Sequence, residues 1–260
     1  MDWRWLRDAR SGPERPGWTH ARSYAGWSPT NVVHRSRLAT LRRLLRDLDL
    51  PERGLVVDLG CSDGFVLAEL RRHAAVPAAW RMAGYDRHRR LLRIAKERSV
   101  PGARFRRLDL NDSSTRVADP GDVVVCLETL EHVGDYRAAL EVIHHATRPG
   151  GVLMLTMPNE VGPIGLAKLL GRPVVRRGAY AGFFSSRCEA FRYGIAVATY
   201  GDLERFREPA RSGWGPHLGF DYRNVSRYVA ARFVDEGLWS MEQTARSGLG
   251  ANVFIVARRH

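Results

Sequence analysis

The feature that most constrains this chain is an alternation of short apolar runs with helical stretches, which begins at residue 55. This alternation is typical of βαβ units, in which successive strands are parallel and helices cover both faces of the sheet. The apolar runs that fit strands occupy residues 55–59, 81–86, 104–108, 122–127, 152–157, 238–244 and 251–258. The sequence therefore predicts an α/β fold built on a doubly wound, mostly parallel sheet of seven strands, with a helix at about 225–236 before the last two.

The segments that flank this pattern predict additional parts. Ser28-Pro29 resembles an N-cap followed by proline in the first helical turn, and leucines then share one face, so a helix is expected at 29–48. We divide the chain into an N-terminal arm and cap helix, 1–50, and a main domain, 51–260. The cap helix either closes over a site as a lid or packs on the sheet. Periodicity is lost after the fifth strand, so 159–216 is interpreted as an irregular insertion.

Length and composition exclude several classes of protein. With 260 residues, 44% of them hydrophobic, the chain can bury one substantial core. No apolar run approaches the roughly 18–20 residues of a membrane span, and Met1 to Arg10 does not have the pattern of a signal sequence. The three cysteines lack the spacing of a zinc site. We expect a cytoplasmic protein with reduced thiols and no membrane partner, monomeric or homodimeric.

The net charge of +13 raises the question of nucleic acid, because basic surfaces neutralise phosphates. Lys96 and Lys168 are the only lysines, and the arginines occur in every segment instead of one stripe. This distribution is typical of biased codon usage. Nucleic acid is therefore not the expected partner, although the charge does not exclude it.

A glycine-containing turn follows the first strand, in the run from Val56 to Phe65. Gly60 and Gly64 allow the backbone to turn tightly and approach a ligand, at the edge of the sheet where such folds bind ligands. The turn lacks the third glycine of a dinucleotide-binding motif, and Asp63 near the helix start would repel a pyrophosphate. A cationic nucleoside such as S-adenosylmethionine fits this acidity better.

Two aspartates end the next two strands. Asp86 lies 22 residues after Gly64, where a carboxylate can hydrogen-bond both ribose hydroxyls. The alternative is that Asp86 only caps the helix that follows. Asp109 ends the third strand and can accept a hydrogen bond from an adenine amino group.

The run from Leu55 to Glu160 resembles the class I, Rossmann-like S-adenosylmethionine-dependent methyltransferases. The likeness is greatest to ubiquinone-biosynthesis O-methyltransferases and to natural-product and sugar methyltransferases. The motifs that carry it are Asp58-Leu59-Gly60-Cys61-Ser62-Asp63-Gly64, Tyr85-Asp86, Leu108-Asp109, Cys126-Leu127-Glu128-Thr129-Leu130-Glu131-His132-Val133, and Arg148-Pro149-Gly150-Gly151 leading to Thr156-Met157-Pro158-Asn159. Ser62 replaces the second glycine that is usual in the first motif.

This resemblance implies S-adenosylmethionine as cofactor, S-adenosylhomocysteine as product, and a set of cofactor-binding residues. The backbone from Gly60 to Gly64 is expected to hold the methionine part, and Asp86 the ribose. Asp109 and Leu110 are expected at the adenine, and Leu127 and Glu128 at the methyl donor. The complete candidate set is Asp58, Gly60, Cys61, Ser62, Asp63, Gly64, Asp86, Arg87, Asp109, Leu110, Leu127 and Glu128.

Methyl transfer from a sulfonium is an in-line displacement, so a base is needed only when the acceptor must lose a proton. His132, with its neighbour Glu131, is the candidate base because it follows the fourth strand and titrates near neutral pH. The alternative is a histidine that only hydrogen-bonds the loop. Glu128, Glu131 and His132 are expected on one helical face. No metal is expected, because the sequence does not define a further ligand.

The acceptor is expected at the insertion, which follows the carboxyl end of the fifth strand. Its aromatic side chains form either an acceptor pocket, a small satellite core or a dimer contact, with Arg176, Arg177 and Arg187 nearby for an anionic group. These side chains are Tyr180, Phe183, Phe184, Phe191, Tyr193, Tyr200, Phe206 and Trp214. We predict methyl transfer to a hydroxyl or amine of a small molecule, a specialised metabolite or sugar. The alternative is a metal-assisted RNA 2′-O-methyltransferase, suggested by the basic charge and by Glu128, Glu131, His132 and His217.

Overall fold

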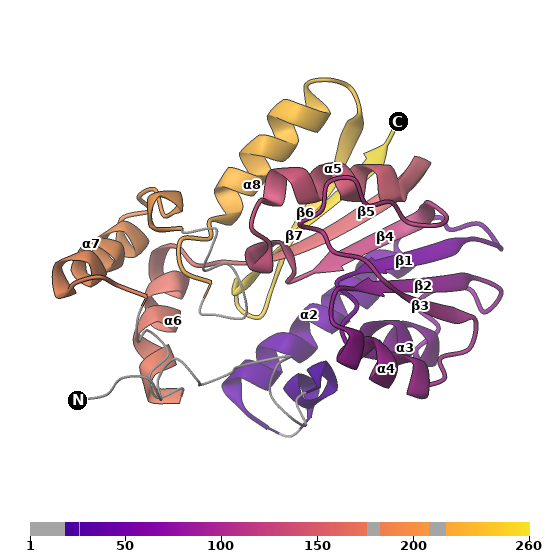
Figure 1. Cartoon of the computed structure of the whole chain (residues 1–260), viewed down its shortest axis with the longest axis horizontal. Coiled ribbons are helices and arrows are strands. Elements are labelled where there is room, and N and C mark those ends of the chain that lie inside the picture. The colour runs from indigo at the N-terminus through magenta and orange to yellow at the C-terminus, as the bar shows by residue number, and fades with distance from the viewer. Residues whose placement is uncertain (1–18, 26, 176–182, 208–216) are drawn as a thin grey trace.

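A seven-stranded sheet forms the centre of the computed structural model, which describes residues 19–25, 27–175, 183–207 and 217–260 (Figure 1). Five of the strands begin and end within one residue of the ranges expected from the sequence, whereas the fifth and sixth strands extend beyond their expected ranges. The strands are β1 (Leu55–Leu59), β2 (Arg81–Asp86), β3 (Ala103–Arg107), β4 (Gly121–Leu127), β5 (Thr147–Pro158), β6 (Trp239–Ser247) and β7 (Asn252–Arg259).

The strand order is β3-β2-β1-β4-β5-β7-β6. β1 pairs in parallel with β2 and β4, and only β7 runs antiparallel to its neighbours β5 and β6. The predicted α/β fold with a mostly parallel, seven-stranded sheet is therefore confirmed. Because the chain winds outward in both directions from β1 and β4, the carboxyl ends of these two strands form the switch point at which such sheets bind ligands.

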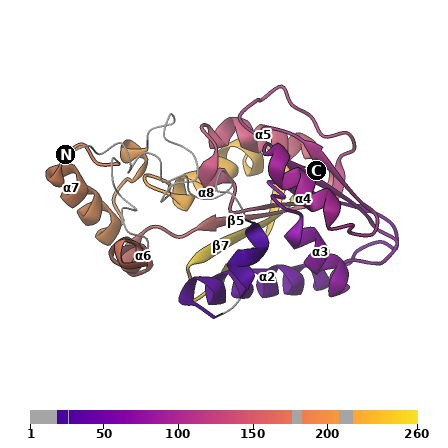
Figure 2. The same ribbon diagram turned by 60° about the horizontal axis from the view of Figure 1, so that its bottom comes forward.

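Helices cover both faces of this sheet (Figure 2). The helices α2 (Pro29–Arg46), α3 (Phe65–Arg72) and α4 (Arg89–Glu97) share one apolar core with the sheet. On the other face, α5 (Tyr136–Ala146) and α8 (Tyr222–Val229) pack around a second core. A π-helical turn at Ala230–Val234 extends α8, so this helical segment begins and ends a few residues before the 225–236 expected from the sequence.

The predicted N-terminal helix is present as α2. The Ser28 side chain accepts a hydrogen bond from the backbone N–H of Asn31 at 3.1 Å, and Pro29 occupies the first turn. Leu41 and Leu45 are fully buried against the sheet. The helix therefore packs on a face of the sheet, and its packing gives no sign of a separate lid.

The expectation that residues 159–216 are irregular is wrong for most of the described part. Two helices lie there, α6 (Gly162–Val175) and α7 (Arg187–Ala198), and they project beyond one end of the sheet (Figure 1). Ser186 caps α7, since its side chain accepts from the N–H of Glu189. Interior glycines such as Gly165 and Gly194 weaken the helical pattern in the sequence, which explains why the helices were missed.

Three of the described aromatics of the insertion, Phe184, Tyr193 and Phe206, belong to a satellite core. Tyr193 is buried among Val161, Ala196, Val197 and Leu203, with Phe184 and Phe206 packed alongside. Phe191 and Tyr200 are exposed. Tyr180, Trp214, Arg176 and Arg177 lie outside the described residues.

The junction between α5 and β5 also differs from the sequence-based expectation. The apolar run that fits the fifth strand begins at residue 152, so Thr147 and Arg148-Pro149-Gly150-Gly151 were not expected in that strand. Instead α5 ends at Ala146, and these residues open β5.

Within the described ranges, no helix has the length and apolar character to cross a membrane.

Candidate functional site

A pocket opens at the carboxyl ends of β1, β2 and β4, at the switch point of the sheet. It brings together eight of the candidate cofactor-binding residues and the candidate base His132. Its lining consists of His20, Gly60, Ser62, Asp86, Arg87, His88, Leu108, Asp109, Leu110, Asn111, Leu127, Glu128, Thr129, His132 and Val133. Asp58, Cys61, Asp63 and Gly64 do not contribute to this lining.

The turn after β1 brings backbone to the floor of the pocket. Gly60 has a φ of +84°, and a Cβ there would lie 2.3 Å from the Thr129 hydroxyl oxygen, so no larger residue fits. The N–H groups of Gly60 and Cys61 both donate to the carbonyl of Tyr85, at 2.8 and 2.9 Å. These bonds hold the turn against the end of β2, where Gly60 and Ser62 line the pocket.

Asp86 fastens the turn to the second strand. One carboxylate oxygen accepts from the N–H of Ser62 at 2.9 Å, and the other from the N–H of His88 at 2.8 Å. Burial raises the pKa of Asp86, and its hydrogen bond from His88 opposes this. The carboxylate therefore organises both loops and also faces the pocket, which is compatible with a role as a cap and with a role in ribose binding.

Of the two candidate aspartates outside the lining, Asp63 has local partners and Asp58 is buried. Asp63 is fully buried, accepts from Arg98 at 3.0 Å and from the N–H of Ala21 at 3.0 Å. Its charge is thus balanced by Arg98, so the expectation that Asp63 repels a ligand phosphate does not describe this structure. Burial, with Asp86 as a second cause, raises the pKa of Asp58 to about 8. Burial also raises the pKa of the Cys61 thiol.

Glu128 reaches the pocket from the end of β4 in a left-handed conformation, with φ of +48°. Its N–H donates to the carbonyl and the hydroxyl oxygen of Thr156, both at 3.1 Å, and its carboxylate accepts from that hydroxyl at 3.2 Å. The helical turn that follows covers only Leu130–His132. The expectation that Glu128 shares a helical face with Glu131 and His132 is therefore wrong.

Arg37 and His20 are two residues near the site that the sequence analysis missed. The Arg37 side chain is buried, and its guanidinium lies 3.4 Å from Glu128 and donates to the Tyr24 hydroxyl at 3.0 Å. A signal existed for Arg37, because it precedes Leu41 by four residues and so falls on the apolar face of α2. His20 comes from the N-terminal arm, and nothing in its sequence context identified it.

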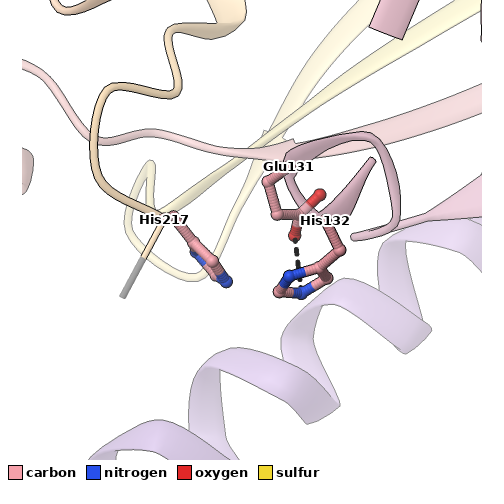
Figure 3. A group of neighbouring side chains, drawn as sticks. All are labelled: Glu131, His132 and His217. Atoms are coloured by element: carbon pink, nitrogen blue, oxygen red, sulfur yellow. Dashed lines mark ion pairs between the residues drawn. The ribbon is translucent and has the colours of Figure 1, made fainter. Parts of the chain in front are cut away.

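Glu131, His132 and His217 converge beside the pocket, as Figure 3 shows. One nitrogen or oxygen from each lies within 4.8 Å of the others, and the Nε2 of His132 is 3.9 Å from a Glu131 oxygen. Glu131 is buried, and no hydrogen bond from the described residues reaches either carboxylate oxygen. Burial, and then the nearby Glu128 carboxylate, raise the pKa of Glu131 well above its usual range.

His217 enters the site from the segment that returns from the insertion. Its ring centroid lies 4.9 Å from that of His132, and its Nδ1 lies 3.6 Å from a Glu160 oxygen. Lys168 of α6 is 3.4 Å from the same carboxylate. The site thus contains two imidazoles, each beside a carboxylate, and this arrangement can hold and exchange protons or supply several ligands to a cation.

Comparison with known proteins places the chain among methyltransferases. A family model described as "Methyltransferase domain" matches residues 33–186. The chain is 32% identical over 136 residues to trans-aconitate 2-methyltransferase from Variovorax paradoxus (strain S110), covering 52% of this chain and 51% of the relative. It is 25% identical over 119 residues to a ubiquinone biosynthesis O-methyltransferase from Aeromonas salmonicida (strain A449), covering 45% and 48%. The chain thus spans about half the length of the curated relatives it matches.

The fold has solved counterparts over nearly its whole length. Magnesium protoporphyrin IX methyltransferase from Synechocystis PCC 6803, solved with bound S-adenosylhomocysteine, matches with a TM-score of 0.55 at 15% identity, covering 92% of both chains. A methyltransferase from Aquifex aeolicus matches with a TM-score of 0.52 at 12% identity, covering 90% of this chain and all of the other. At these identities the likeness shows the fold.

Proposed function

Because the chain belongs to the methyltransferase-domain family, we propose that it is an S-adenosylmethionine-dependent methyltransferase that acts on a hydroxyl or amine of a small molecule, a specialised metabolite or sugar. The observation that carries the proposal is the convergence of Gly60, Asp86 and His132 on one pocket at the switch point. Gly60 and Ser62 line the pocket in the turn after β1, and this turn suits the methionine part of the cofactor. When bound, the cofactor supplies a methyl group activated by a sulfonium.

The residues that line the pocket would have different roles in binding and catalysis. Asp86 would accept from the ribose hydroxyls, and Asp109 with Leu110 would contact the adenine. Leu127 and Glu128 would border the methyl donor. His132 would remove the acceptor's proton as the nucleophile attacks, because it lines the same pocket and its imidazole suits proton transfer at neutral pH. Glu131 would stabilise the imidazolium that forms.

Calorimetry with S-adenosylhomocysteine tests this proposal. We expect saturable binding by the full chain with one site. An acceptor screen would follow, with methylated products detected by mass spectrometry after incubation with S-adenosylmethionine. Absence of any binding by the folded protein would refute the proposal before an acceptor is known.

A second candidate is a metal-assisted RNA 2′-O-methyltransferase, which the close approach of Glu131, His132 and His217 favours. In that case the three side chains would hold a divalent cation that binds the ribose hydroxyl of the acceptor. Two measurements distinguish it from the small-molecule enzyme. Its activity would stop in chelator, and its affinity for short RNA would fall by orders of magnitude between about 50 and 200 mM salt.

A further inference from the structure

The Glu131 carboxylate is a buried polar group beside the pocket that lacks hydrogen bonds. Its side chain is fully buried, and among the described residues no hydrogen bond reaches either oxygen. Its ion-pair partner among the described residues is His132, at 3.9 Å. A buried carboxylate without a hydrogen bond is costly, so such a group points to a binding partner that arrives from outside the chain.

The cations around Glu131 are engaged with other groups. Arg37 contacts Glu128 and the Tyr24 hydroxyl. Lys168 donates to the carbonyls of Asn159 and Ala251 and lies beside Glu160. Arg207 donates to the carbonyl of Val133 at 2.7 Å and to the backbone carbonyl of Glu131 at 3.4 Å. The charge of Arg37 favours the ionised form of Glu131, but none of these contacts is a hydrogen bond to its carboxylate, so an external N–H donor can still bind there.

We propose that the acceptor is an amine, bound as its ammonium form by Glu131 between His132 and His217. This inference rests on the proposed methyltransferase function and selects the amine from its two acceptor classes. An ammonium offers three N–H donors, and the three side chains offer acceptor atoms within 4.8 Å of one another. A hydroxyl has one donor and no charge, so it would leave the buried carboxylate uncompensated.

The position of the three side chains allows the amine to be both held and activated. The ammonium gives one proton to the His132 imidazole, which becomes an imidazolium beside Glu131. The freed nitrogen lone pair forms the new bond to the methyl carbon, and the carbon–sulfur electron pair returns to sulfur. The products are a methylated ammonium and neutral S-adenosylhomocysteine, and His132 then releases its proton to solvent.

His217 and Glu160 complete the proposed amine site. The Nδ1 of His217 lies 3.6 Å from a Glu160 oxygen, and Figure 3 shows the other edge of the ring directed towards His132. When Nδ1 carries the proton, the other ring nitrogen can accept a hydrogen bond. In that tautomer His217 would supply an acceptor to the ammonium from a different part of the chain.

The amine site can be tested without knowing the acceptor. Sinefungin is a cofactor analogue with an amine at the position of the transferred methyl group, whereas S-adenosylhomocysteine has nothing there. Calorimetry on the full chain should show that sinefungin binds more tightly than S-adenosylhomocysteine by roughly tenfold or more, the range of one charge-assisted hydrogen bond. Glu131→Gln should abolish this ratio and leave the affinity for S-adenosylhomocysteine unchanged. Glu141→Gln is the matched control. Glu141 lies on α5 away from the pocket and pairs with Arg232, so this variant should keep the preference for sinefungin.

Each other outcome overturns the inference. If the ratio of the affinities for sinefungin and S-adenosylhomocysteine is the same in the unmodified protein and in Glu131→Gln, the carboxylate does not bind the amine. Loss of both affinities in Glu131→Gln, with unchanged thermal unfolding, assigns it to the cofactor instead. If Co²⁺ gives a visible absorption that depends on Glu131 and removes the preference for sinefungin, the group is a metal site. If the unmodified protein binds neither ligand, the proposed methyltransferase function fails as well, which separates the two failures.

Discussion

The guanidinium of Arg37 on α2 lies 3.4 Å from the carboxylate of Glu128, at the end of β4. Through this contact the N-terminal helix reaches across the face of the sheet to the edge of the pocket. Tyr24 extends the connection, since its hydroxyl accepts from Arg37 and its ring centroid lies 4.6 Å from that of Phe65. The cap helix thus contributes to the geometry of the site as well as to the core.

Arg37→Met should destabilise the protein by about 3 kcal/mol, because removing one partner of a buried ion pair leaves the other uncompensated. Urea denaturation monitored by tryptophan fluorescence measures the change. Arg42→Met on the same helix is the control, because the Arg42–Glu69 pair is longer, at 4.0 Å, and the Arg42 side chain is more exposed. A loss below about 0.5 kcal/mol in Arg37→Met would show that water replaces the pair without cost.

Asp86→Ala should weaken binding of S-adenosylhomocysteine by removing charge-assisted hydrogen bonds, each worth about 1.5 to 3 kcal/mol. The same carboxylate holds the N–H groups of Ser62 and His88, so the ligand-free protein should also lose stability. Calorimetry and thermal unfolding of the ligand-free variant separate the two effects. Unchanged affinity together with a lowered unfolding temperature would make Asp86 a cap only.

Activity and cofactor binding should withstand chelator, because displacement at a sulfonium needs no Lewis acid. The measurement compares methyl transfer before and after treatment with EDTA, followed by gel filtration. Activity that disappears and returns with Mg²⁺ or Mn²⁺ would instead support the second candidate function, with Glu131, His132 and His217 as the cation site.

Acid should destabilise the fold through His144. This side chain accepts from the indole N–H of Trp239 at 2.8 Å, and burial, followed by the charge of Arg259, lowers the pKa of His144 to about 4. The unfolded chain therefore takes up this proton first, and the free energy of unfolding should fall by about 2 kcal/mol as pH drops from 6.5 to 4. His144→Gln keeps an acceptor for Trp239 without the titration, so its stability should fall less over that range. Parallel pH profiles in urea would contradict this role.

The strands were predictable from sequence because buried parallel strands are continuous apolar runs bounded by glycine, proline and charged residues. The glycine turn and Asp86 were predictable for a related reason, since both stand directly after such runs. The geometry of the Glu128 to His132 segment was not predictable. Its spacing fits a helix, but the left-handed φ of Glu128 and the hydrogen bonds from its N–H to Thr156 break that helix.

Contacts between segments that are distant in the chain were also not predictable from the sequence pattern. Whether His217 approaches His132 depends on how α6 and α7 fold back, and the glycines and arginines of that region obscure its helical period. The pairing of Asp63 with Arg98 depends on the packing of α4 against α3, so an exposed acidic turn could not be told from a neutralised one. Local pattern therefore predicted which residues follow the strand ends better than it predicted contacts between distant segments.

His132→Ala should keep the affinity for S-adenosylhomocysteine near that of the unmodified protein and lower turnover by roughly 10² to 10⁴, the range expected for the loss of a general base. His132 lines the pocket beside Glu131 and His217, where it would face the acceptor. Turnover measured against pH supplies the decisive readout. In the unmodified protein the rate should fall on the acid side as the imidazole becomes protonated, and this limb should disappear in the variant.

With an ammonium acceptor, the turnover of the variant should also recover as pH rises towards the pKa of the amine, because the free amine then attacks without help. If turnover falls only in proportion to lost folding or lost cofactor binding, His132 is structural, and His217 is the next candidate for the base.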